Sequence, residues 1–80
     1  MKQGVKKVII DFQDHQIPVY WTDERRGTIE LLIQVLERKL ESGRDLVKRF
    51  LSTIDSIEIE GSEAILYSSR ESGTLALSLY

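Results

Sequence analysis

The longest hydrophobic pattern in the chain lies between residues 28 and 54, and its period is that of a helix. Its positions recur at steps of three, four and one residue, so all of them fall on one side of a helix. They are Ile29, Leu32, Ile33, Leu36, Leu40, Gly43, Val47, Phe50, Leu51 and Ile54. This pattern predicts an amphipathic helix whose apolar face packs on the rest of the protein.

The weakest point of this predicted helix is Ser42-Gly43. Ser42 and Asp45 have the spacing of a capping box, which would start a second helix, and a glycine inside a helix costs about 1 kcal/mol relative to alanine. However, the apolar positions keep their phase through Gly43. We therefore predict one long helix over 28–54, with any bend at Ser42-Gly43. At about 1.5 Å per residue it is longer than the strands and extends beyond the sheet.

Alternation of apolar and polar residues predicts strands on both sides of the helix. Before it, the alternating segments are 5–13 and 17–21, joined by a loose loop at 14–16 because no glycine is present for a tight two-residue turn. After it, the segments are 56–60, 64–68 and 74–80, separated by short turns. We therefore predict a single α+β domain over 1–80. It is a two-layer sandwich with a mainly antiparallel sheet of about five strands in the chain order ββαβββ, crossed by the helix on one face.

One helix covers only one face of such a sheet. The other face receives Ile9, Tyr20, Ile65, Tyr67 and Tyr80. The strand 74–80 has no covering element after it, so it forms an exposed edge. With the overhanging helix, these features predict a homodimer. The alternative is a self-contained monomer with scattered apolar residues on its surface.

Composition narrows the classes of function. The chain has 80 residues, no cysteine and a net charge of −2. The absence of cysteine excludes disulfides, thiolate catalysis and cysteine-ligated metals. The sequence has no apolar run of about 18 residues and no signal-peptide pattern, so we expect a cytoplasmic protein without a membrane partner. The negative charge disfavours a general nucleic-acid binder, which needs a positive excess.

Candidate catalytic residues are few. His15 is the only histidine and lies between Asp14 and Gln16. A general base paired with Asp14 is one interpretation, and a solvated turn residue is the other. The second is favoured because no further group is tied to His15 by a recognisable spacing. One histidine among scattered acids has no metal-ligand spacing, and the glycines form no phosphate-binding loop. We therefore expect no catalytic residue, cofactor or metal, and a protein that is not an enzyme.

Basic and aromatic residues are the candidates for partner binding. Arginine and aromatic side chains are enriched in interface hot spots, and both also contact nucleic acids. The residues we predict to contact a partner are Tyr20, Arg25, Arg26, Arg44, Lys48 and Arg49. A solvated helix face is the alternative for the basic residues, because acids are interleaved with them. Trp21 alternates with Ile17 and Val19, so we expect it in the core.

The sequence therefore predicts a small non-enzymatic protein-interaction module, such as an adaptor, inhibitor or assembly factor. It acts as a homodimer and binds an unidentified protein. The alternative is a nucleic-acid-associated regulatory protein that uses a local arginine and lysine patch on the helix despite the negative total charge.

Overall fold

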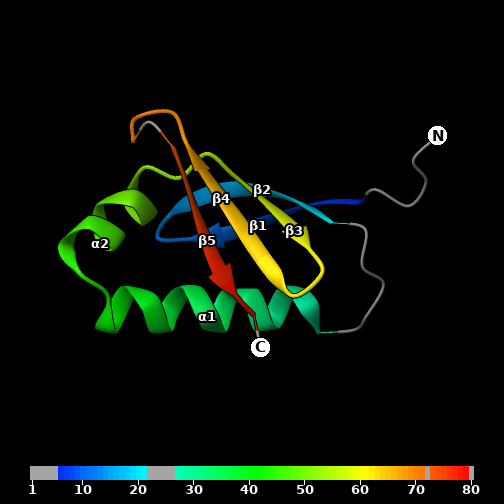
Figure 1. The fold of residues 1–80 in the computed structure, drawn as a ribbon. Coiled ribbons are helices and arrows are strands. Elements are labelled where there is room, and N and C mark those ends of the chain that lie inside the picture. The colour runs from blue at the N-terminus through cyan, green and yellow to red at the C-terminus, as the bar shows by residue number, and fades with distance from the viewer. Residues whose placement is uncertain (1–5, 22–26, 72, 80) are drawn as a thin grey trace.

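The protein forms one five-stranded sheet with two helices, both on one side of it (Figure 1). The computed structural model describes residues 6–21, 27–71 and 73–79. The elements are β1 (Lys6–Phe12), β2 (His15–Trp21), α1 (Thr28–Ser42), α2 (Asp45–Ser52), β3 (Ser56–Glu60), β4 (Glu63–Ser68) and β5 (Gly73–Ser78). The predicted α+β class is confirmed, but one long helix is replaced by two.

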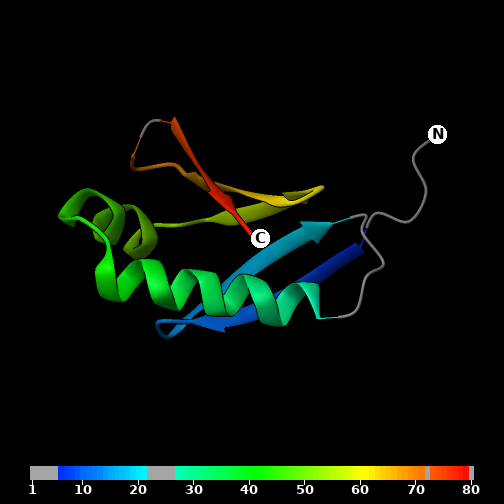
Figure 2. The ribbon, with the colours of Figure 1, turned by 60° about the horizontal axis from the view of Figure 1, so that its bottom comes forward.

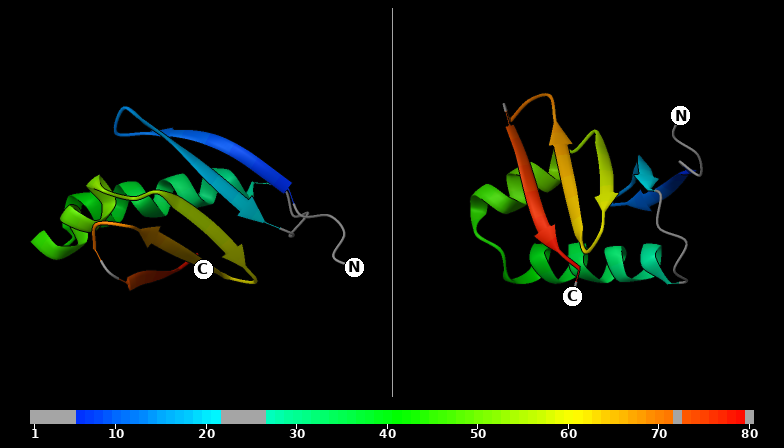
Figure 3. Two further views of the ribbon diagram at one scale, coloured as in Figure 1. Left: turned by 90° about the horizontal axis from the view of Figure 1, so that it is seen from above. Right: turned by 45° about the vertical axis from the view of Figure 1, so that its right-hand side comes forward.

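The strands lie in the sheet in their chain order, β1-β2-β3-β4-β5. Neighbouring strands are antiparallel except β2 and β3, which are parallel because the chain crosses between them through both helices. This parallel pairing is short, joining Val19–Trp21 of β2 to Ile57–Ile59 of β3. The two strands diverge toward their beginnings, and α2 lies at that end (Figure 2). Figure 3 shows the same divergence of the β1–β2 hairpin from β3, β4 and β5.

The core lies between the helices and one face of the sheet. Every strand contributes alternate side chains to it, as the period-two pattern requires. The buried apolar residues are Ile10, Phe12, Ile17, Val19, Leu32, Val35, Leu36, Phe50, Leu51, Ile54, Ile57, Ile59, Ala64, Leu66, Leu77 and Leu79. Trp21 packs against this cluster, which confirms its predicted place in the core.

The prediction of a single helix over 28–54 is wrong. The chain leaves the helix at Gly43 and Arg44, which have extended backbone angles (φ −77°, ψ 161° and φ −73°, ψ 165°). The capping box suggested by Ser42 and Asp45 is not formed either. Arg44 is the N-cap of α2 and has no side-chain capping bond, and the Ser42 hydroxyl donates to the Arg38 carbonyl oxygen instead. The single long helix that was predicted to extend beyond the sheet is therefore not formed.

Burial of the apolar residues that follow Gly43 in the helical pattern explains the break. A continuous helix would carry Phe50, Leu51 and Ile54 past the end of the sheet, whereas the break folds them into the core. Burying each large apolar side chain stabilises the fold by about 1.5–3 kcal/mol. Losing the helical hydrogen bonds of two residues costs about 0.5–1.5 kcal/mol each. The apolar positions before and after the break keep the same helical phase because both helices pack on the same sheet.

The β1–β2 turn also differs from its prediction. Phe12 pairs directly with His15, so Gln13 and Asp14 form a two-residue turn in place of a loose loop at 14–16. Both have positive φ, 55° and 62°, as a type I′ hairpin turn requires. Aspartate tolerates this conformation because its short side chain can bond to the local backbone. The absence of glycine therefore did not exclude a tight turn.

Gly43 provides a test of the helix break. A β-carbon at this position would overlap the backbone carbonyl oxygen of Lys39 and press on the Val47 side chain. We predict that Gly43→Ala lowers the free energy of unfolding by about 1–3 kcal/mol, the usual effect of overpacking. Denaturant unfolding followed by circular dichroism measures it. Ser42→Ala, which loses one exposed hydrogen bond, is the matched control.

The sign of this change discriminates between the two structures. In a continuous helix, alanine is favoured over glycine by about 1 kcal/mol. A Gly43→Ala variant that is more stable than the natural chain would therefore contradict the break at Gly43 and Arg44.

Candidate functional site

The face of the sheet opposite the helices is covered by no element in the described part of the chain. We call it the open face. Its side chains are Lys7, Ile9, Asp11, Gln16, Pro18, Tyr20, Ser56, Glu58, Glu60, Glu63, Ile65, Tyr67, Thr74, Ala76 and Ser78, from the strand registers. The sequence placed five apolar or aromatic residues on the face opposite the helix. Four of them lie on the open face: Ile9, Tyr20, Ile65 and Tyr67. The fifth, Tyr80, lies outside the described residues.

The apolar residues of the open face surround a carboxylate. Tyr20 of β2 is in register with Glu58 of β3, and Glu58 is in register with Ile65 of β4. All three are half-buried. Ile9 lies opposite Pro18 on the outer hairpin and is 51% exposed. An apolar and aromatic surface thus flanks Glu58 on both sides.

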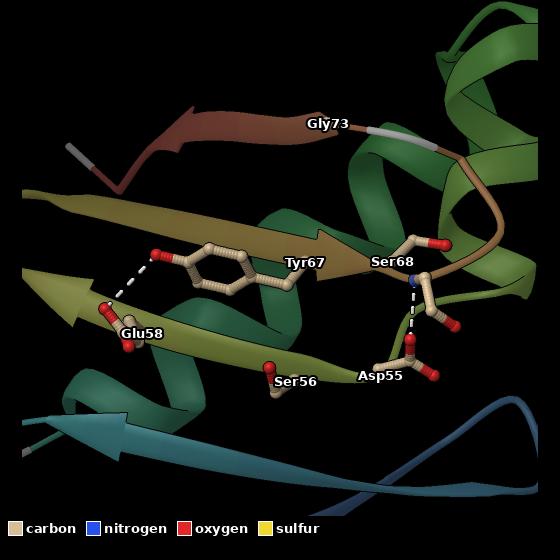
Figure 4. Close-up of a pocket in the computed structure, with 7 residues that line it drawn as sticks. Asp55, Ser56, Glu58, Tyr67, Ser68 and Gly73 are labelled. Carbon is tan, nitrogen blue, oxygen red and sulfur yellow. Dashed lines mark hydrogen bonds between the residues drawn. The ribbon is translucent and has the colours of Figure 1, made fainter.

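Tyr67 and Glu58 define a shallow hollow of about 490 Å³ on this face (Figure 4). The Tyr67 hydroxyl donates to Oε2 of Glu58 at 3.3 Å. The pKa of Tyr67 is raised above its ordinary value of 10.0, first by burial and then by the neighbouring charge of Glu58. The hollow therefore combines an aromatic wall with a negative charge.

Asp55 closes the other end of the hollow. It accepts a hydrogen bond of 2.6 Å from the backbone N–H of Ser69 (Figure 4). Hydrogen bonding by the Ser69 side chain and then by its backbone N–H lowers the pKa of Asp55, and the charge of Arg70 acts in the same direction. Asp55 is thereby held as a carboxylate that positions the β4–β5 turn.

Ser68 connects this turn to α2. Its side chain is buried, and its hydroxyl lies 2.8 Å from the Thr53 hydroxyl and donates to the Thr53 carbonyl oxygen at 3.0 Å. The backbone N–H of Glu71 donates to the same Ser68 oxygen at 3.3 Å. A buried hydroxyl with several partners holds its neighbours rigidly, since an unpaired one would cost about 1–3 kcal/mol. The end of α2 and the start of β5 are thus tied together.

The outer edge of β5, which pairs with no further strand among the described residues, is the second surface with functional potential. Its sequence, GTLALS, contains no charged residue and no proline. The backbone N–H of Leu79 donates to the Ser62 carbonyl oxygen, so the odd-numbered residues of β5 bond toward β4. By alternation, the backbone groups of Thr74 and Ala76 face outward from the sheet. β1, the other edge strand, carries Lys7 and Asp11 and is protected by charge.

An apolar groove of about 270 Å³ runs beside this edge. α2 supplies Leu46, Val47 and Phe50 to it, and β5 with its preceding turn supplies Glu71, Gly73, Thr74 and Leu75. Leu46 is 66% exposed, the largest exposure of a large apolar residue among those described. We call this the edge groove.

The predicted partner-binding residues do not form one site. Tyr20 lies on the open face, with Nζ of Lys7 5.9 Å from the centre of its ring. Arg44, Lys48 and Arg49 are exposed on α2, in the other layer of the sandwich. The structure brings Arg44 and Lys48 within one helical turn, since the Lys48 N–H donates to the Arg44 carbonyl oxygen. Arg25 and Arg26 lie outside the described residues.

His15 and the acidic side chains are the described residues that catalytic or metal chemistry would use. His15 is exposed at the β1–β2 turn, away from both hollows. No group of three or more acidic, histidine or cysteine side chains among the residues described converges as a metal site. Neither described helix has the length and apolarity needed to cross a membrane.

The residues missed by the sequence-based prediction are Glu58, Thr74 and Ala76. Alternation along the strand 56–60 places Glu58 on the side opposite Ile57 and Ile59, but only the register places it between Tyr20 and Ile65. The sequence predicted an exposed edge at 74–80, and the absence of charge in GTLALS was the further signal that could have identified Thr74 and Ala76.

Comparisons with protein-family models, curated protein sequences and solved structures find no match to this chain.

The contact between Glu58 and Tyr67 gives a measurable titration. We predict that Glu58→Gln moves the pKa of Tyr67 back toward 10.0 and leaves the part of the shift caused by burial. Because the pKa of Tyr67 is higher in the folded chain than in the unfolded chain, the folded state holds the phenol proton more tightly. The stability that this adds is fully present below the unfolded pKa and is lost as the pH rises through the folded pKa. Absorbance of the phenolate measures it, with Tyr67→Phe identifying the signal. Glu37→Gln on α1 is the control, and an equal shift in that variant would contradict the assignment.

Proposed function

We propose that this protein is a small non-enzymatic interaction module of the cytoplasm that pairs with a second copy of itself through the free edge of β5. The observation that carries the proposal is an edge strand without charge or proline beside the apolar edge groove. Such an edge offers unpaired backbone groups to another strand. The module then acts as an adaptor, inhibitor or assembly factor that presents its remaining surfaces to another protein.

Antiparallel pairing of two β5 strands fits the residues at this edge. A two-fold axis at Ala76 places Thr74 and Ala76 in position to bond across the interface with their outward backbone groups. The same register brings the half-buried Leu75 beside Leu77 of the second copy, so apolar area is covered on the core side. No like charges meet, because β5 has none.

The other supports for a dimer are weaker than the sequence indicated. The long helix predicted to extend beyond the sheet is not formed, because the chain breaks at Gly43 and Arg44. The open face carries Glu58, Glu60 and Glu63 close together, so packing two copies face to face would oppose like charges. The β5 edge is therefore the surface that supports self-association.

A charge placed on the edge tests this proposal. In Ala76→Lys, two lysines would meet at the two-fold axis, and we expect the mass measured by light scattering after size exclusion to fall from two chains to one. Ala76 is exposed, so the fold and its circular dichroism should be retained. Gln34→Lys, on the exposed side of α1, is the matched control and should stay dimeric.

Two results would overturn the proposal. The first is a natural chain with the mass of one copy up to the highest concentration that remains in solution. The second is a dimer that persists in the folded Ala76→Lys variant.

Nucleic-acid association is the second candidate function. Arg44, Lys48 and Arg49 are exposed on α2, and Arg44 and Lys48 lie one helical turn apart. This arrangement suits contact with neighbouring phosphates. Asp45 in the same helix and the acidic open face weaken the attraction, which places this candidate second.

Salt-dependent binding to a short DNA duplex tests this candidate. We expect retention at low salt that falls steeply as salt rises, and loss of retention in the Arg44→Gln, Lys48→Gln double variant. Lys7→Gln, on the open face, is the control. A chain that does not bind at low salt, or a double variant that binds like the natural chain, would exclude the candidate.

A further inference from the structure

Two adjacent strands of the open face differ in chemistry along their length. β4 presents the half-buried Ile65 and Tyr67, which form a short apolar ridge. On the same face of β3, Glu58 lies beside Ile65, whereas Ser56 lies beside Tyr67 and Glu60 lies beside Glu63. The apolar ridge is therefore flanked by Glu58 and is followed, at the Ile65 end, by the acidic pair Glu60 and Glu63.

We propose that this part of the open face binds an amphipathic helix of another protein whose polar flank is basic. The apolar stripe of that helix lies over Ile65 and Tyr67, and its lysine or arginine side chains lie over Glu58 and Glu60. This surface is independent of the β5 edge, so the inference does not rest on self-association.

The spacing of the acids suits a helix. Side chains two apart on a strand are separated by about 7 Å, while residues one turn apart on a helix surface are separated by about 6 Å. Basic residues at positions i and i+4 therefore reach Glu58 and Glu60 together. A helix on this face would also cover the second side of the sheet, whose first side is covered by α1 and α2.

Glu58 is the anchor of the site because of its surroundings. It is half-buried between Tyr20 and Ile65, and Tyr67 donates to it at 3.3 Å. A basic side chain arriving there is partly shielded from water, which strengthens its attraction to the carboxylate.

Charge identifies the occupant of this face. A second copy would bring Glu58, Glu60 and Glu63 against the same acids, and an acidic helix would meet the same repulsion. A purely apolar helix would leave Glu58 desolvated without a counter-charge. Basic side chains on the polar flank of the helix pair with Glu58 and Glu60, while its apolar side chains cover Ile65 and Tyr67.

The test uses two synthetic helical peptides of about 18 residues, long enough to form a helix on binding. Both have the same leucine stripe, and the polar flank is lysine in one and glutamate in the other. Isothermal titration and amide chemical-shift mapping on the full chain measure binding. We expect the lysine peptide to bind, with shifts centred on Glu58, Ile65 and Tyr67, and the glutamate peptide not to bind.

Three variants separate this site from general attraction between opposite charges. The double variant Glu58→Gln, Glu60→Gln should bind the lysine peptide about tenfold more weakly. The double variant Glu37→Gln, Glu41→Gln on α1 should bind it with unchanged affinity. Ile65→Glu adds a negative charge but removes the ridge. It should weaken binding, although charge attraction alone would strengthen it.

Several results would overturn the inference. They are absence of binding by the lysine peptide, equal binding of the glutamate peptide, shifts centred on α2, or tighter binding by Ile65→Glu. Concentration-dependent shifts at Ile65 and Tyr67 without peptide would show instead that a second copy occupies the face. Failure of the β5 dimer would not affect the result, because Glu58, Ile65 and Tyr67 lie on β3 and β4 and do not include the outward backbone groups of β5.

Discussion

Burial of Phe50 and Leu51 of α2 against the core is the interaction on which the arrangement of this protein depends. It covers the end of the sheet where β2 and β3 diverge, and it requires the chain to leave the helical conformation at Gly43 and Arg44. The part-buried hydrogen bonds between Thr53 and Ser68 then attach the end of α2 to β4. Because α2 is held there, Leu46 and Val47 form one wall of the edge groove beside β5.

The same packing decides which surfaces remain for partners. The helices cover one face of the sheet, so side chains of the opposite phase in every strand are left on the open face. Charge then gives the remaining surfaces different roles. The β5 edge has no charge and suits pairing with an identical strand, whereas Glu58 and Glu60 on the open face disfavour self-packing and favour a basic partner.

The spacing of apolar residues along the sequence was enough to predict the class of fold, the five strands and the core position of Trp21. This is because alternation in a strand and phase in a helix record which side of each element is buried. It did not predict the break at Gly43, since two helices on one sheet preserve the phase as well as one. The tight turn at Gln13 and Asp14 was missed because two residues in the left-handed region leave no periodic signal. The setting of Glu58 between Tyr20 and Ile65 depends on register across three strands, which a pattern along the chain does not contain.

The two proposed surfaces are compatible in one assembly. Antiparallel pairing of two β5 strands about an axis perpendicular to the sheet places both open faces on the same side. The two Glu58 residues are then five strand intervals apart, about 24 Å at about 4.8 Å per interval. This exceeds the screening length of about 8 Å at physiological salt, so their repulsion does not oppose the dimer. Two basic helices joined by a linker that spans this distance would bind with higher avidity than either alone, because the second binding event becomes intramolecular.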